Sequence, residues 1–247
     1  MFSSLLPPSL PLALVGVDAL FLAYRQSDPI GKGIVLVQIG ISVVAWCVMI
    51  SKGRRLNETF HRATAYRNLF NEASHSMELY RSGRSSPDPL ETIYRAACER
   101  LAKLFGPTGL ESWLRGDVGV RGLGDSELEL VRSATENTLY QQKNEIESGM
   151  SILATAVTAA PLLGLLGTVL GVLMAFQSMA RSGSALLSDV APALSSAMLT
   201  TVVGLLVAIP TAIGYNWLQA KIENIAILMD GFTDDLNGRI GCDFRQR

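Results

Sequence analysis

Hydroxyl side chains recur along one side of an apolar block that covers residues 190–220. Ser196 and Thr200 lie four residues apart, as do Ala197 and Thr201. Residues four apart share one face of a helix, so these side chains would form a stripe of small and hydroxyl groups. Such a stripe can pack closely against other helices, or its hydroxyls can replace part of the hydration shell of an ion in a narrow wet pathway. Composition alone favours packing and leaves conduction open.

Glycines mark the preceding apolar block in a similar way. Gly164, Gly167 and Gly171 are spaced by three and four residues, so they share a helical face and would let a neighbouring helix approach closely. Gly204 continues the row of small residues in the later block. Thr168 lies beside the glycine face, but a lone threonine in a helix usually bonds back to its own backbone. The glycines therefore predict helix packing, and Thr168 alone is weak support for conduction.

Each of these blocks also contains a proline, Pro161 in the earlier and Pro210 in the later. A proline inside a helix leaves one backbone carbonyl without its usual donor, which lipid tolerates only where neighbours or water satisfy that carbonyl. We therefore expect both prolines to be hinge points.

The two blocks contain no Asp, Glu, Lys, Arg or His. A proton relay needs a titratable group within the membrane, so if protons pass here another chain must supply that group. The same absence, together with the lack of a nucleotide-binding motif, argues against a membrane enzyme or a carrier. Widely spaced cysteines and two isolated histidines predict neither a disulfide framework nor a metal or cofactor site. A net charge of −1 gives no basic surface for nucleic acid.

The composition indicates what must position these residues. Hydrophobic residues make up 49% of the 247 positions and charged residues 17%, and the apolar ones are concentrated in long uncharged blocks. We predict an all-α integral membrane protein with three transmembrane helices, at residues 31–51, 149–180 and 190–220. The last two exceed the ~20 residues that a span needs, so they would tilt or protrude from the membrane.

Basic residues near the span ends orient the chain. Lys52, Arg54 and Arg55 follow the first span at once, and such residues are retained on the cytoplasmic side. This predicts a periplasmic N-terminus, and the remaining segments then follow in order: a cytoplasmic domain at 52–148, a short periplasmic loop at 181–189 and a cytoplasmic tail at 221–247.

We expect residues 52–148 to be mostly helical. Three breaks are expected there, at 85–89, 106–109 and 116–124. Asp125 is a good helix cap, and no Gly or Pro follows it before Gly149, so we expect this helix to run straight into the second span. If it reached Met179 it would be ~80 Å long, and long helices would then extend into the cytoplasmic domain.

Residues 1–30 form a separate N-terminal segment. Residues 10–24 are apolar but include Asp18 and are too few for a span, while their apolar side chains recur on one helical face. This predicts an interfacial amphipathic helix. A signal peptide is the alternative, although the segment lacks a basic n-region and a clear cleavage site.

The motifs resemble those of the MotA/TolQ/ExbB proton channel family, with ExbB and TolQ the most similar branch. The run GLLGTVLG from Gly164 to Gly171 resembles the family's second-span signature. The third-span likeness rests on Val190-Ala191-Pro192, Thr200-Thr201, Gly204, Ala208-Ile209-Pro210 and Tyr215-Asn216. The predicted order of spans and loops agrees with this family as well.

The resemblance implies an inner-membrane subunit that forms a homopentamer around the transmembrane helices of a dimeric ExbD/TolR-like partner. An intramembrane aspartate of that partner would carry the proton past threonines matching Thr168 and Thr201, with Thr200 and Ser196 beside the path. Proton flow would drive rotation that transmits force, through a TonB/TolA-like protein, to the outer membrane or envelope.

One position departs from the pattern. ExbB and TolQ carry a glutamate near the outer end of the third span, and Ser196 stands there in this chain. MotA-type stators also lack that glutamate, but they have four spans. Two alternatives therefore stay open: a membrane scaffold that does not conduct, and a motility or defence motor of the same family.

Overall fold

The structure is a computed structural model that describes residues 24–25, 28–73, 76, 78–81, 88–115, 122–182 and 187–244. Residues 10–23 of the expected interfacial helix lie outside the described part of the chain. The same is true of residues 183–186 in the expected periplasmic loop and of residues 245–247 in the expected tail.

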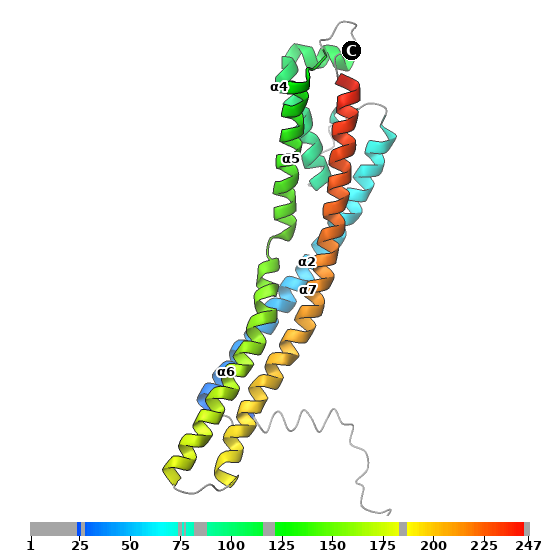
Figure 1. Cartoon of the computed structure of the whole chain (residues 1–247). Coiled ribbons are helices and arrows are strands. Elements are labelled where there is room, and N and C mark those ends of the chain that lie inside the picture. The colour runs from blue at the N-terminus through cyan, green and yellow to red at the C-terminus, as the bar shows by residue number, and fades with distance from the viewer. Residues whose placement is uncertain are drawn as a thin grey trace, which may run out of the picture. The chain divides into compact units, whose positions relative to one another are not determined.

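The described chain is built from helices, as Figure 1 shows, and this confirms the all-α prediction. In chain order they are α2 (Pro29–Glu72), α3 (Glu78–Arg81), α4 (Pro89–Arg115), α5 (Asp125–Glu147), α6 (Met150–Ser182) and α7 (Leu187–Phe244).

Three of these helices, α2, α6 and α7, are long and apolar enough to cross a membrane. Only 17% of the most apolar window of α2 and 28% of that of α6 is buried within the chain. Large apolar side chains such as Leu36, Leu165, Phe176 and Ile213 are instead exposed. Because exposed apolar surface of this extent is unfavourable in water, lipid is the solvent that fits these faces.

The chain divides into two compact units. The first combines residues 29–50 of α2 with α6 and residues 187–216 of α7, and it contains all the predicted site residues. The second combines residues 51–72 of α2 with α3, α4, α5 and the remainder of α7. Each unit is described below by itself.

The helix that begins at Asp125 does not run into the second span, so that prediction is wrong. α5 ends at Glu147, and Gly149 takes a left-handed backbone with φ +81°, which stops the helix before α6 begins at Met150. The hydroxyl of Ser148 donates to the carbonyl of Glu145 at 2.7 Å, which satisfies one carbonyl of the last turn. The carbonyl of Ser148 accepts a 2.7 Å hydrogen bond from Lys52 Nζ.

In the second unit, the local sequence explains where α4 and α5 begin and where the geometry of α4 is interrupted. α4 begins at Pro89, where a missing N–H costs nothing, and the preceding Asp88 caps it by accepting from Leu90 N–H at 3.0 Å. Gly106, with φ +71°, interrupts the regular geometry of α4 within the expected break at 106–109. Gly124 rather than Asp125 is the cap of α5.

α7 extends far beyond the predicted third span. It runs without interruption from Leu187 to Phe244, through Pro192 and Pro210, and so includes most of the expected tail. In the second unit its buried side chains recur at helical spacing, and they include Leu218, Ile225, Met229, Phe232 and Leu236.

Candidate functional site

The glycine row of α6 packs against α7. A Cβ built on Gly164 would lie 2.9 Å from the carbonyl oxygen of Thr200, and one on Gly171 would lie 2.5 Å from Ala197 Cβ. A Cβ on Gly167 would overlap the side chain of Thr200. Helices can approach this closely only where side chains are absent, so packing, the expected role of the three glycines, is what the geometry shows.

The two threonines of α7 meet at one carbonyl of α6. Thr200 Oγ1 lies 3.2 Å from the carbonyl oxygen of Gly164, and Thr201 Oγ1 lies 3.1 Å from the same oxygen. Thr200 is 1% exposed and is also within 2.7 Å of the carbonyl of Ala197, while Thr201 is half-buried. Gly164 O is therefore the point where both hydroxyls of the α7 stripe converge.

The other two hydroxyls lie apart from this point. Ser196 is 5% exposed, one turn from Thr200 along α7. Thr168 is half-buried and donates to the carbonyl of Leu165 in its own helix at 2.7 Å. The structure thus brings Thr200 and Thr201 together, and gives Thr168 the local bond that is usual for a threonine in an apolar helix.

The prolines lie inside continuous helices. Pro161 belongs to α6 and Pro210 to α7, and both are half-buried. Ala160, next to the first, packs in a small apolar cluster with Val207 and Ala208. Neither proline ends its helix, and their role as hinges stays a prediction.

Gln38 of α2 was not singled out from the sequence, although it is buried at the same level. It is 0% exposed, and its Nε2 donates to the carbonyls of Ala160 at 3.3 Å and Thr200 at 3.0 Å. Gly204 leaves the space for it, because a Cβ there would lie 2.9 Å from Nε2. One amide thus contacts both α6 and α7. The signal in the sequence was a lone amide within an uncharged span.

The hydrogen bonds of Gln38 contribute little net stability. Both carbonyls lie within helices, where each already accepts an N–H from the next turn, and interhelical bonds in membranes contribute only about 0.6 kcal/mol each. The other amide atom, Oε1, is buried with no hydrogen-bond partner among the described residues. An unsatisfied buried acceptor costs about 1–3 kcal/mol, which offsets both bonds.

No carboxylate, lysine, arginine or histidine lies between residues 33 and 50, 149 and 180, or 190 and 220. No group of three His, Cys, Asp or Glu residues in the described part of the chain is placed to hold a metal. The site formed by Gly164, Thr200, Thr201 and Gln38 therefore offers hydroxyl and carbonyl oxygens and no charge of its own. It can solvate a passing cation or proton carrier, but it has no group of its own that titrates.

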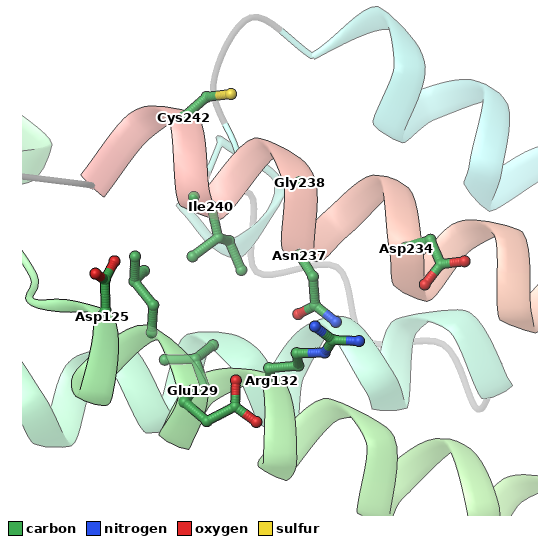
Figure 2. A pocket seen from close by; sticks show the side chains of 11 residues that line it. Asp125, Glu129, Arg132, Asp234, Asn237, Gly238, Ile240 and Cys242 are labelled. Carbon is green, nitrogen blue, oxygen red and sulfur yellow. The ribbon is translucent and has the colours of Figure 1, made fainter.

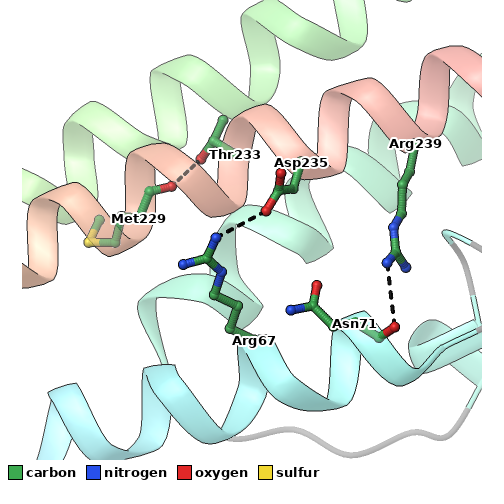
Figure 3. Close-up of polar contacts among 6 residues, drawn as sticks. All are labelled: Arg67, Asn71, Met229, Thr233, Asp235 and Arg239. Carbon is green, nitrogen blue, oxygen red and sulfur yellow. Dashed lines mark hydrogen bonds and ion pairs between the residues drawn. The ribbon is translucent and has the colours of Figure 1, made fainter.

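In the second unit, charged contacts join the end of α2 to α7, and Figure 3 shows two of them. Arg67 pairs with Asp235 at 3.2 Å. Arg239 donates from Nη1 to the carbonyls of Phe70 at 2.8 Å and Ala73 at 3.2 Å, and its guanidinium lies 4.6 Å from the centre of the Phe70 ring. Arg239 therefore caps the last turn of α2.

A groove of about 740 Å³ lies between α5 and α7 in this unit. Its polar lining includes Asp125, Glu129 and Arg132 from α5 and Asp234 and Asn237 from α7 (Figure 2). Arg132 pairs with Glu136 on its own helix at 2.8 Å. The groove contains none of the predicted site residues.

Burial perturbs several groups of the second unit. It raises the pKa of the Cys98 thiol to about 12, partly offset by the hydrogen bond with Tyr94. It also raises the pKa of Asp88 above the ordinary value, although the bond from Leu90 N–H opposes this shift. Both groups lie in or beside α4 and belong to its packing.

Long helices that turn their apolar faces outward define the class of protein: an all-α, multi-pass membrane protein. The MotA/TolQ/ExbB proton channel family matches residues 89–231, more than half of the chain, and the chain belongs to this family. This confirms the resemblance drawn from the span motifs, and it places the chain among channel and energy-transduction proteins.

Relatives named TolQ and ExbB match over most of their length. The Tol-Pal system protein TolQ of Pseudomonas aeruginosa is 27% identical over 205 residues, which cover 82% of this chain and 84% of that protein. The biopolymer transport protein ExbB of Xanthomonas campestris pv. campestris is 26% identical over 248 residues, covering 97% and 94%. ExbB of Neisseria meningitidis serogroup A is 23% identical over 219 residues, covering 89% and 96%.

Proposed function

We propose that this chain is the ion-conducting subunit of an inner-membrane complex that uses the proton motive force to energise transport or envelope processes at the outer membrane. The observation that carries the proposal is the convergence of Thr200 and Thr201 on Gly164 O between two spans that contain no Asp, Glu, Lys, Arg or His. Oxygen ligands without a proton carrier are what a channel subunit needs if a second protein brings the acid.

That second protein would be a single-span partner of the ExbD/TolR type with an intramembrane aspartate. Several copies of this chain, five by analogy with the family, would surround its transmembrane helices. Thr168 and Ser196 would lie along the same path, and a TonB/TolA-like protein would receive the force. Family membership and relatives named ExbB and TolQ support this arrangement.

The proposed topology follows the charges at the span ends. Lys52, Arg54 and Arg55 would place residues 52–148 in the cytoplasm, the N-terminus in the periplasm and the end of α7 in the cytoplasm. Trp217 lies 4.1 Å below the Lys221 ammonium, a pairing of ring and cation that suits a membrane–water interface.

Proton flux into liposomes tests the proposal. The complex with its ExbD/TolR-type partner should conduct. The double substitution Thr200→Val, Thr201→Val should strongly reduce the flux, because it removes both hydroxyl oxygens that meet at Gly164 O. Thr211→Val is the matched control: Thr211 is buried in α7, as Thr200 is, but the structure gives its hydroxyl a bond only to Val207 O within its own helix, at 2.7 Å. Equal flux from all three proteins would contradict the assignment of the pathway.

A scaffold that does not conduct is the second candidate. Ser196 favours it, because a neutral residue stands where ExbB and TolQ carry a glutamate. A scaffold would assemble with the partner, as shown by the mass of the extracted complex, and would carry no flux. Motility and defence motors of the same family would conduct and differ in the process that they drive.

A further inference from the structure

Gln38 is a polar side chain that is fully buried within the first unit. Its two donated bonds reach carbonyls that are already bonded within their helices, and its Oε1 has no partner among the described residues. The net effect on stability is therefore close to zero or unfavourable. A side chain that does not stabilise the packing needs another explanation.

The position of Gln38 supplies an explanation for this buried amide. The amide donates to Ala160 O, one turn before Gly164 on α6, and to Thr200 O, which belongs to one of the two threonines at Gly164 O. Gln38 therefore fixes α6 against α7 at the level where the hydroxyls converge. It is a polar contact between the first span and this site.

The unpaired Oε1 makes this contact easy to release. When α6 and α7 separate from α2, the two amide bonds are lost, but Oε1 becomes free to accept a hydrogen bond from water or from a hydroxyl. That gain offsets part of the loss, so the amide itself adds little to the free-energy difference between the packed and separated arrangements. A polar contact of this kind therefore opposes a movement of the first span only weakly.

We propose that Gln38 is a positioning residue of the ion pathway, a releasable clamp that joins the first span to the α6–α7 hydroxyl site. The inference rests on the proposed function, because it assigns a role in conduction to a residue outside the two spans that hold the hydroxyls. It also makes the first span part of the working channel rather than a membrane anchor.

The test compares Gln38→Met with wild type in the full complex with an ExbD/TolR-type partner. Methionine is close in volume and has no amide, so the variant should keep the mass of the complex and should unfold at the same temperature or a higher one. Proton flux should fall roughly tenfold, within the range by which coupling residues outside a site change function. Gln177→Met, at an exposed position of α6, is the matched control and should leave both quantities unchanged.

A second comparison separates positioning from general packing. If Gln38 acts through the hydroxyls, Gln38→Met should lower the flux by a smaller factor in the Thr201→Val background than in wild type. The reason is that both substitutions then remove the same function. Fully additive losses would overturn the inference.

Three other outcomes also overturn it. A lower unfolding temperature of Gln38→Met would assign Gln38 to stability. Full flux through that variant, with wild type active, would refute the clamp while leaving the proposed function intact. Absence of flux from an intact wild-type complex would refute the proposed function, and the clamp with it.

Discussion

Replacing Gly167 by alanine tests whether close contact between α6 and α7 holds the hydroxyl site together. A Cβ on Gly167 would lie 2.6 Å from Thr200 Cβ and 2.9 Å from its Cγ2, whereas ordinary contacts of this kind are 3.4–4 Å. The helices must therefore separate by about 1 Å to accept the methyl group. The bonds from Thr200 and Thr201 to Gly164 O, now 3.2 and 3.1 Å, would then exceed hydrogen-bonding distance.

The expected loss of stability follows from three contributions. Overpacking costs about 1–3 kcal/mol, and two lost interhelical bonds cost about 0.6 kcal/mol each. The better helix propensity of alanine returns up to ~1 kcal/mol. Gly167→Ala should therefore lower the free energy of unfolding by about 1–4 kcal/mol.

Unfolding of the detergent-extracted protein, followed by circular dichroism, measures this change. Gly40→Ala in α2 is the matched control, because a Cβ there would have nothing within 4 Å. The control should be as stable as wild type or slightly more so. If Gly167→Ala is no less stable than Gly40→Ala, the close approach of α6 and α7 is not what the structure indicates.

Three further predictions concern the second unit. Arg239→Gln should lower the free energy of unfolding by about 1–2 kcal/mol, because the carbonyls at the end of α2 lose their guanidinium donor. Denaturant titration would measure this change. A variant as stable as wild type would exclude a capping role for Arg239. Burial raises the pKa of Asp88, so between the unfolded and the native pKa the native protein holds a proton that the unfolded chain has released. The protonated carboxyl therefore contributes to stability fully below pH ~4, and this contribution is lost as the pH rises through the native pKa. Asp88→Asn, which keeps a capping side chain, should therefore raise the unfolding temperature at pH 7 and not at pH 3, and a uniform shift at both would contradict this reasoning. An impermeant maleimide added to the cytoplasmic side should label the exposed Cys242. It should leave Cys98 unlabelled, because Cys98 is buried and burial raises the pKa of its thiol to about 12. Labelling of Cys242 from the periplasmic side alone would reverse the proposed topology.

The spans and the glycine face could be predicted from the sequence because each depends on a single helix. Long uncharged blocks require lipid, and residues spaced by three and four share a face whatever packs against it. Gly164, Gly167 and Gly171 therefore lie where their spacing indicates. The break at Gly149 was missed because the uncharged block that follows it appeared to continue the helix, while the left-handed conformation of one glycine was enough to end it.

Contacts between helices could not be predicted in this way. Thr200 and Thr201 point to one carbonyl of α6 only because the glycines let the helices meet there, and spacing within α7 does not reveal the partner. Gln38 is a single amide 122 residues from Ala160 and 162 from Thr200, with no local pattern to mark it. The continuation of α7 to Phe244 was not predicted either, because the apolar pattern that marks the third span ends at residue 220.

We propose that this chain conducts protons with an acid supplied by its partner. The most direct measurement is proton flux, driven by a pH gradient, into liposomes that contain the chain with its ExbD/TolR-type partner, either intact or with the partner's intramembrane aspartate changed to asparagine. We expect flux through the intact complex and none through the altered one. An assembled complex that carries no flux, or flux that persists without the aspartate, would contradict it.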